Sequence, residues 1–437
     1  MRRPVLVLVA AGLVAGIAAA SLALASSGSA PRDARRSASS PMLPLEAPVS
    51  PDNTAAEVAA LERKVAAEPD DAEALVQLGL AYQQRARETA DPTYYPRSEA
   101  ALRRGLRLGG DRLTIFTGLA SLAASRHRFE DALAFARHAQ RLAPVNATVD
   151  AVLGDASVEL GRYRQAFAAF DRMARLKPSL AAYVRVAYAR ELLGRPAGGI
   201  DAMRMAVAAG SGNAENTAWT LTQLGTLEFD TGHVEAATRA YRQALERLPG
   251  YVHALAGLGR VDAARGELLR AASFYRRAIA KVPLPQYVIA LGDVEHVAGR
   301  EGAARRAYAL VGAIERLFRA NGVRTELETA LFDLDHHRDV RSALTRARAA
   351  FIAAPSINAE DVLAWALYRN GNCVAAERHS SRALRLGTRD ALKLFHRGMI
   401  ERCLGHAGAS RAFLDEALAI NPHFSLLYAP TARRLAR

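Results

Sequence analysis

Lysine is scarce in this chain of 437 residues, occurring only at Lys64, Lys177, Lys281 and Lys393. Arginine therefore supplies nearly all of the formal net charge of +14, and the arginines are scattered along the sequence rather than clustered. Nucleic-acid recognition normally needs a basic stripe with stacking aromatic side chains. We therefore expect no nucleic-acid partner, whereas attraction to anionic lipid or to an envelope polymer stays open.

The sequence also lacks the common catalytic motifs, because it has no Gly-rich phosphate loop, nucleophile elbow or His-Glu-x-x-His pattern. One cluster resembles metal ligands, from Asp333 to His337, and these two residues are four apart on one helix face. A catalytic zinc or iron normally needs three ligands and a shaped pocket. We interpret the cluster as a polar turn and expect no enzyme, metal or cofactor. A metal-dependent enzyme at this cluster is the alternative.

Recurring small residues divide the chain into units of similar length. After Gly225, the landmarks Gly232, Ala237, Tyr241 and Pro249 follow at offsets of 7, 12, 16 and 24 residues. The first landmark recurs, mostly every 33 or 34 residues, at Gly79, Ala120, Gly154, Ala187, Gly225, Gly259, Gly292, Leu331, Ala364 and Gly398. Such a fixed period is the signature of a stacked-repeat protein.

The residue types at these offsets suit two antiparallel helices joined by a tight turn. Alanine at offset 12 lets the helices approach closely, the aromatic residue at offset 16 fills space beside the next unit, and proline at offset 24 ends the second helix. Glycine at offset 7 suits a left-handed residue that ends the first helix. These glycines are Gly161, Gly194, Gly232, Gly266, Gly299, Gly371 and Gly405.

This order of leucine-glycine, alanine, aromatic residue and proline over about 34 residues resembles the tetratricopeptide repeat. The resemblance covers residues 70–425 and implies an all-α fold, a right-handed α-solenoid of about ten helix-turn-helix units. Some positions depart from the pattern, with Leu331 and three alanines in place of the first glycine. Some proteins of this family bind acidic chaperone termini through a lysine- and asparagine-rich clamp, which the few lysines of this chain cannot form.

The N-terminal region reads as a targeting segment followed by a tether. Arg2 and Arg3 precede an uncharged run from Pro4 to Ala30, which indicates a signal peptide or a single membrane anchor within residues 1–25. Either fate places the repeats outside the cytoplasm. Residues 26–53, rich in Ser, Pro and Ala, are predicted to be a disordered linker. We expect a capping helix at residues 54–69 and a C-terminal cap at residues 426–437.

Two irregular units stand out within the repeats. Extra residues around Asp91–Pro96 predict a protruding loop between the two helices of the first unit. The helix that contains Tyr308 is expected to run on to about Ala320, which lengthens that unit by about five residues.

The two cysteines, Cys373 and Cys403, fall at the same edge of adjacent units. Cys373 follows Gly371 at the start of a second helix, and Cys403 precedes Gly405 at the end of the next first helix. In an oxidising compartment this placement predicts a disulfide. Two buried thiols acting as small apolar residues are the alternative.

The concave face of the superhelix is the expected working surface for protein or peptide partners. Aromatic residues beside carboxylates suit peptide capture, although Phe332 and Trp365 could equally pack between helices. The predicted partner-binding residues are Trp219, Phe229, Glu328, Phe332, Asp335, Asp361, Trp365 and Tyr368. We therefore expect a non-enzymatic interaction scaffold outside the cytoplasm, with an adaptor held to the envelope or membrane by positive charge as the alternative.

Overall fold

A computed structural model describes residues 51–210 and 214–437. The predicted signal peptide or anchor and nearly all of the predicted linker lie outside the described residues. No described helix is both long and apolar enough to cross a membrane.

The described residues form 22 α-helices and no strand. In chain order the helices are α2 (Pro51–Ala67), α3 (Ala72–Thr89), α4 (Tyr94–Arg107), α5 (Arg112–Ser125), α6 (Phe129–Leu142), α7 (Ala147–Glu159), α8 (Tyr163–Leu176), α9 (Leu180–Leu192), α10 (Pro196–Ala209), α11 (Ala214–Asp230), α12 (Val234–Arg247), α13 (Val252–Ala264), α14 (Leu268–Lys281), α15 (Pro285–Val297), α16 (Glu301–Ala320), α17 (Glu326–Asp335), α18 (Val340–Ala353), α19 (Ile357–Arg369), α20 (Cys373–Ala383), α21 (Ala391–Cys403), α22 (Ala407–Ile420) and α23 (Ala429–Ala436).

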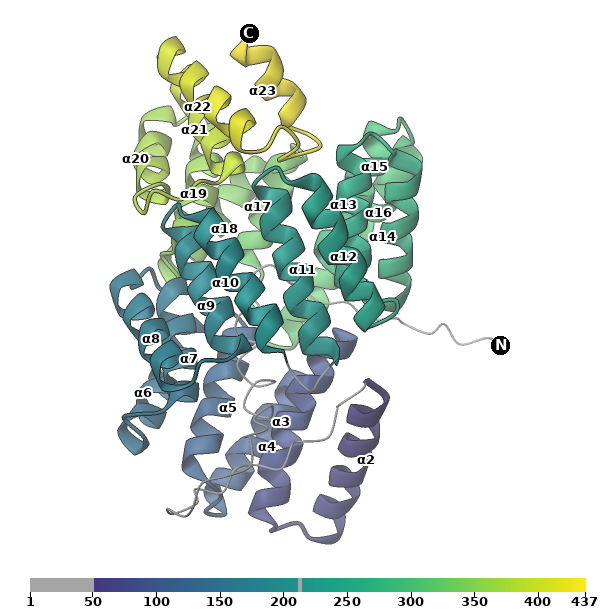
Figure 1. The fold of residues 1–437 in the computed structure, drawn as a ribbon, viewed down its shortest axis with the longest axis vertical. Coiled ribbons are helices and arrows are strands. Elements are labelled where there is room, and N and C mark those ends of the chain that lie inside the picture. The colour runs from purple at the N-terminus through teal and green to yellow at the C-terminus, as the bar shows by residue number, and fades with distance from the viewer. Residues whose placement is uncertain (1–50, 211–213) are drawn as a thin grey trace.

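Helices α3 to α22 pack as ten consecutive pairs, which we number as units 1 to 10 (Figure 1). Helix α2 packs on the first pair and α23 on the last. The predicted all-α solenoid of about ten helix pairs is confirmed. First helices of neighbouring units touch one another, for example α5 with α7 and α11 with α13, and α7 is buried from Val149 to Glu159. The second helices are more amphipathic and form the outer surface.

The backbone explains the glycine landmarks. All seven glycines predicted at offset 7 have φ between +67° and +84°, in the left-handed region that ends a helix. A Cβ on Gly225 would lie 2.7 Å from the ring of Tyr241, and one on Gly257 would lie 2.4 Å from the same ring. Tyr241 therefore fills the space between its own unit and the next, as its offset predicts.

Two units make the same turn with histidine instead of glycine. His127 has φ +54° and His337 has φ +53°. In unit 8 the left-handed residue is therefore His337, and counting back seven residues gives Ala330, which is fully buried. The first landmark of this unit is Ala330 rather than Leu331, because its turn contains one additional residue.

The structure contradicts the prediction for one of the two irregular units and agrees with it for the other. The extra residues of unit 1 do not protrude, because α3 continues to Thr89, α4 begins at Tyr94, and Tyr95 is buried. In unit 7, α16 runs to Ala320, as the sequence predicts. The longer helix is followed by a connection that reaches across to unit 2.

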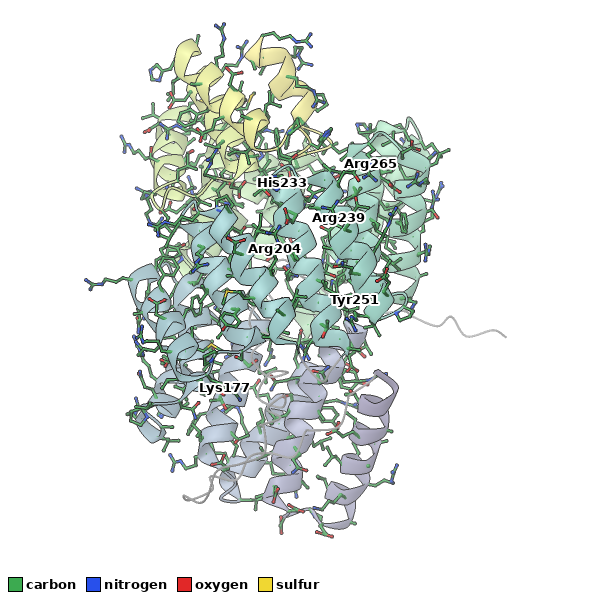
Figure 2. All side chains as sticks on the ribbon, in the orientation of Figure 1. Lys177, Arg204, His233, Arg239, Tyr251 and Arg265 are labelled. Carbon is green, nitrogen blue, oxygen red and sulfur yellow. A yellow bond between two sulfur atoms is a disulfide. The ribbon has the colours of Figure 1, made fainter. Side chains whose placement is uncertain are left out.

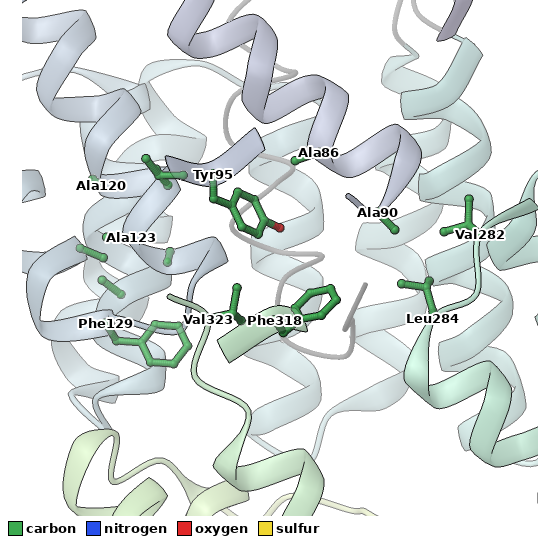
Figure 3. Packing of buried hydrophobic residues seen from close by; sticks show 14 of the residues in the cluster. Ala86, Ala90, Tyr95, Ala120, Ala123, Phe129, Val282, Leu284, Phe318 and Val323 are labelled. Atoms are coloured by element: carbon green, nitrogen blue, oxygen red, sulfur yellow. The ribbon is translucent and has the colours of Figure 1, made fainter. Parts of the chain in front are cut away.

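The second half of the superhelix stacks directly on the first half. The turn inside each of units 1 to 5 meets the chain that follows the second helix of the unit five places later, and we call this contact line the seam. At its first position, Ala90 lies beside Val282 and Leu284 in one hydrophobic cluster (Figure 3). At the second, Phe318 and Val323 join the same cluster.

Hydrogen bonds continue the seam along the other units. Three of them join the N–H of Ile357 to the Tyr163 hydroxyl at 2.7 Å, the Thr388 hydroxyl to Leu192 O at 2.5 Å, and the Asn421 amide to Phe229 O at 2.8 Å. These residues are 192 to 196 positions apart in the chain. Two of the acceptors are carbonyl groups near helix C-termini, which have no partner within their own helix.

Unit 2 makes the most polar contact of the seam. The Arg126 guanidinium donates to Asn321 O at 2.9 and 3.1 Å, and the N–H of Arg324 donates to Arg126 O at 3.1 Å. His127 Nδ1 lies 2.8 Å from Arg324 O, which requires a proton on that nitrogen. The seam thus closes the gap between successive turns of the superhelix from unit 1 to unit 10.

Candidate functional site

The aromatic residues predicted for the concave face are mostly buried. Phe229, Phe332 and Trp365 are 1%, 5% and 2% exposed, and Asp361 is 5% exposed. In this structure they pack between helices, which favours the packing interpretation of Phe332 and Trp365. The four other predicted residues keep partial exposure, and they are Trp219, Glu328, Asp335 and Tyr368.

Trp365 is the centre of an aromatic layer in units 8 to 10. Its ring stacks on His396 with centroids 4.2 Å apart and on Tyr368 at 4.9 Å. Its indole N–H donates to Asp335 at 3.0 Å, and the hydroxyl of Tyr428 donates to the same carboxylate at 2.9 Å. Burial raises the pKa of Asp335, although His396 and the two donors oppose that shift. The layer forms the core of the C-terminal units, closed by Tyr428.

Glu328 lies at the seam rather than on an open groove. Its carboxylate is 3.7 Å from His127 Nδ1 of unit 2. It also interacts with Glu159 of unit 3. Burial, and to a smaller extent the negative charges of Asp155 and Glu328, raise the pKa of Glu159 to about 8. Three carboxylates from units 3 and 8 are thus brought together by the stacking of the two halves.

A second cluster of charges, partly exposed, joins units 4, 5 and 10. Burial, and to a smaller extent the negative charges of Asp230 and Asp390, raise the pKa of Glu191 to about 8. Burial alone would raise the pKa of Asp390, but the ammonium of Lys393 outweighs it and holds the pKa below its usual value. Sequence reasoning missed this cluster, because only the seam brings the units together.

The side chains of the predicted metal-ligand cluster, Asp333 to His337, have separate partners. Asp333 pairs with Arg346 and lies 3.7 Å from Arg338, whereas His337 is 2.6 Å from a nitrogen of Arg369. Burial raises the pKa of Asp333 despite these arginines. Among the described residues, no group of three or more His, Cys, Asp or Glu side chains could hold a metal ion.

His336 of the same cluster joins unit 7 to unit 8. Its Nε2 lies 2.7 Å from Asp293 of α15, and its Nδ1 lies 2.7 Å from Phe332 O. Both partners are acceptors, so only the imidazolium, with two N–H donors, satisfies both bonds. Burial lowers the pKa of His336, but Asp293 outweighs it and the net shift is upward. The hydroxyl of Tyr308 also donates to Asp293, at 2.8 Å.

This joint lies where the apolar core divides. Units 8 to 10 have a hydrophobic cluster of their own, centred on Trp365 and Phe395, whereas Phe332 belongs to the cluster of the earlier units. The rings of Tyr308, Phe332 and His336 fill the boundary with centroids 4.6 to 5.7 Å apart. The polar joint therefore links two separately packed parts of the solenoid.

A solvent-open cleft of about 680 Å³ lies on the outside of units 4 and 5. We call it the α10–α12 cleft. Arg204, His233 and Arg239 lie on its neighbouring helices, on the face toward the viewer in Figure 2. Its lining residues are Ala197, Ile200, Asp201, Arg204, Glu228, Gly232, His233, Val234, Glu235, Ala236 and Arg239.

The charges of the cleft are partly neutralised. Glu228 is 4% exposed and accepts hydrogen bonds from Arg204 at 2.9 Å and from His233 at 2.9 Å, which orients both side chains. Arg239 is exposed and makes no ion pair within the described part of the chain. Apolar side chains with a charged rim suit a short peptide segment.

Cys373 and Cys403 are bonded in the structure, with Cα atoms 6.1 Å apart. Cys373 is the first residue of α20, and Cys403 is the last residue of α21. The bond therefore ties the outer helix of unit 9 to the inner helix of unit 10.

Comparison with known proteins identifies the repeat type. A tetratricopeptide repeat family model matches residues 152–214 and 222–285. No curated protein sequence matches the chain. These matched residues fall in units 3 to 6.

Solved helical-repeat structures are similar to the chain at low identity. PilW, a type IV pilus biogenesis factor, is 19% identical and covers 47% of this chain and 94% of its own, with a TM-score of 0.40. Cut9, from the APC/C hetero-tetramer Cut9-Hcn1, is 13% identical over 88% of this chain and 87% of its own, at 0.39. Human IFIT1, solved as a dimer with m7Gppp-AAAA, is 15% identical over 84% and 86%, at 0.46.

Proposed function

The chain is a tetratricopeptide repeat protein, and from that premise we propose that it is a non-enzymatic scaffold that binds protein partners outside the cytoplasm. Solenoids of helix pairs offer long, rigid surfaces on which partner segments can bind. The uncharged run from Pro4 to Ala30 and the Cys373–Cys403 bond support the placement in an oxidising compartment.

We place the partner at the α10–α12 cleft, and the observation that carries this choice is its open concavity between two units. Three of the aromatic residues expected to bind a peptide, Phe229, Phe332 and Trp365, are instead buried, and the seam closes the superhelix beside them. Ala197 and Val234 provide apolar contact area in the cleft, and Arg239 provides at its rim a guanidinium without an ion pair among the described residues. A peptide with an apolar residue beside a carboxylate fits this lining.

The test is site-specific photo-crosslinking in intact cells. A photoreactive amino acid replaces Arg239 in one strain, and Arg164 of the outer helix α8 in a control strain. We expect a discrete crosslinked protein from position 239 alone, lost again when Ala197→Asp, a change at an exposed cleft residue, is added. Equal products from both positions, or none from position 239, would count against the cleft.

A second pair of positions tests the concave face. Trp219 and Tyr368 keep partial exposure there, and a photoreactive residue at either position reports partners of the inner surface. A discrete partner from these positions and none from Arg239 would move the binding site to the concave face. The compartment is tested by protease treatment of intact and permeabilised cells, and digestion only after disruption of the cytoplasmic membrane would contradict it.

A further inference from the structure

The first helices of the units, which lie inside the solenoid, carry a net negative charge, and the second helices, which lie outside, carry a net positive charge. The ten first helices carry 10 Lys and Arg against 19 Asp and Glu. The ten second helices carry 27 Lys and Arg against 12 Asp and Glu. Arginines that are scattered in the sequence are therefore gathered on the outer surface.

The excess is largest on three successive outer helices, α14, α16 and α18. Together they carry 11 Lys and Arg and only two acidic residues, Glu301 and Glu315. Glu315 lies 3.5 Å from Arg319, and Glu301 lies 2.7 Å from His296. Neither acid is placed to neutralise the remaining arginines of these helices.

Five exposed arginines on α16 and α18 make no ion pair or hydrogen bond through their side chains within the described residues. They are Arg305, Arg306, Arg316, Arg341 and Arg348, and we call them the α16–α18 arginine face. Their guanidinium groups are thus free to meet an anionic partner.

Apolar side chains lie among these arginines. On α16, Leu310 is 50% exposed, and Ala309 and Ala313 beside it are exposed as well. Arg306, Leu310 and Ala313 share one side of the helix because they are spaced four and three residues apart. On α18, Ile352 is 81% exposed. An exposed apolar strip framed by arginine is the pattern of a helix that lies on a membrane surface.

We propose that the α16–α18 arginine face docks on an anionic phospholipid surface. A guanidinium matches the oxygens of a phosphate with two parallel hydrogen bonds, and Leu310 and Ile352 can enter the boundary between headgroups and acyl chains. The contact centres on α16, which carries three of the five arginines together with Leu310. Nucleic acid fits less well, because the exposed residues of the two helices include no aromatic side chain for stacking on bases.

The experiment measures binding of the full chain to vesicles of phosphatidylcholine with and without phosphatidylglycerol. The test variant is Arg305→Glu, Arg306→Glu and Arg316→Glu. The control variant is Arg137→Glu, Arg164→Glu and Arg175→Glu, which makes the same change of net charge on outer helices α6 and α8. The N-terminal segment is common to all three proteins, so its own contribution to binding cancels.

With each basic residue contributing about 1 kcal/mol near an anionic surface, we expect the test variant to bind phosphatidylglycerol vesicles about a hundredfold more weakly. The control variant should retain most of the affinity. A polarity-sensitive dye at Ala309→Cys should shift to the blue on these vesicles and not on pure phosphatidylcholine. This second readout uses the native arginines and does not depend on the folding of the charge variants.

Equal losses in both variants would overturn the proposal in favour of net charge, and no loss in either would remove the face from membrane binding. An unshifted dye on phosphatidylglycerol would also overturn it. Binding of single-stranded RNA or polyglutamate more tightly than vesicles, with loss in the test variant alone, would reassign the face to that polymer.

Discussion

The amide of Asn421 in unit 10 donates a hydrogen bond to the carbonyl oxygen of Phe229 in unit 5, 192 residues earlier in the chain. Asn421 is fully buried, so this bond lies inside the contact between the two turns of the superhelix. Similar bonds join unit 3 to Ile357 at the start of α19, directly after unit 8, and unit 4 to the connection after unit 9. The overall shape of the molecule therefore depends on contacts between units that are five places apart.

Removing the hydrogen bonds of the seam should open the superhelix. In the combined variant Tyr163→Phe, Thr388→Val and Asn421→Leu, Ile357 N–H and Leu192 O lose their partners, at a cost of about 1–3 kcal/mol each. Phe229 O loses one of its two hydrogen bonds and keeps the one from Gly232 N–H. We expect a lower denaturation midpoint and a larger radius of gyration by small-angle X-ray scattering. The control is Asn370→Ala, which removes a bond to Val340 O between neighbouring units. A seam variant with unchanged dimensions would contradict the stacking.

His336 should make stability depend on pH near neutrality. The pKa of His336 in the folded protein is raised above the usual 6.5. Its contribution to the free energy of unfolding is therefore complete below pH 6.5 and is lost as pH rises through the folded pKa. Asp293, Tyr308 and Asp335 are the titratable groups around it. We expect the stability difference between wild type and His336→Phe to shrink between about pH 6 and pH 9.

The neighbouring histidine provides the control for that measurement. Burial, followed by Arg369, lowers the pKa of His337, so wild type should gain stability relative to His337→Phe as pH rises toward 6.5 and should change little above it. Denaturation experiments should therefore show a pH-dependent loss above pH 6.5 for the His336 contribution and a pH-dependent gain below pH 6.5 for the His337 contribution. No loss above pH 6.5 relative to His336→Phe would show that His336 is not held as the imidazolium.

Glu191 should destabilise the fold at alkaline pH. With a folded pKa of about 8 against 4.5 in the unfolded chain, the folded protein retains a proton that the unfolded chain releases. Stability is therefore lost as pH rises from 4.5 to 8. We expect Glu191→Gln to raise the unfolding free energy by at least about 1 kcal/mol at pH 9 and by little at pH 4. Glu246→Gln, at an exposed position, serves as the control. An equal effect of the two substitutions would argue against a raised pKa of Glu191 in its charge cluster.

The bond between Cys373 and Cys403 should stabilise the C-terminal units. It closes a loop with a sequence separation of 30 residues, which corresponds to roughly 3–4 kcal/mol in the chain-entropy account. Cys373→Ser with Cys403→Ser should lower the free energy of unfolding by that amount. Thiol counts on unfolded protein, with and without reductant, check the oxidation state directly, and equal counts would show that the bond does not form.

The sequence predicts local structure well, because its landmarks are set by contacts within one or two units. Gly232 and Gly371 must take a positive φ, and Tyr241 must fit against two glycines, so their spacing indicates the helix pairs directly. The extra residue in the turn of unit 8 escaped prediction. The repeat spacing predicts Leu331 as the landmark, because nothing in the local pattern marks His337 as the left-handed residue.

The candidate site was harder to predict, because it depends on how the units are oriented over a long range. Trp365 has the spacing of a concave-face residue, yet His396 and Tyr428 from later elements cover it. The contact of Glu328 with His127 depends on the rotation accumulated over six units. That rotation is the sum of many small packing angles, and no single residue in the sequence predicts it.

The seam also changes the way in which the molecule should unfold. A solenoid whose units touch only their neighbours behaves as a one-dimensional array, and its ends can fray independently. Contacts such as Asn421 with Phe229 couple each unit of the first half to one of the second, so losing either terminus exposes the middle of the chain. The molecule should therefore melt cooperatively, as a closed cylinder, and fold slowly because these contacts span nearly half of its length.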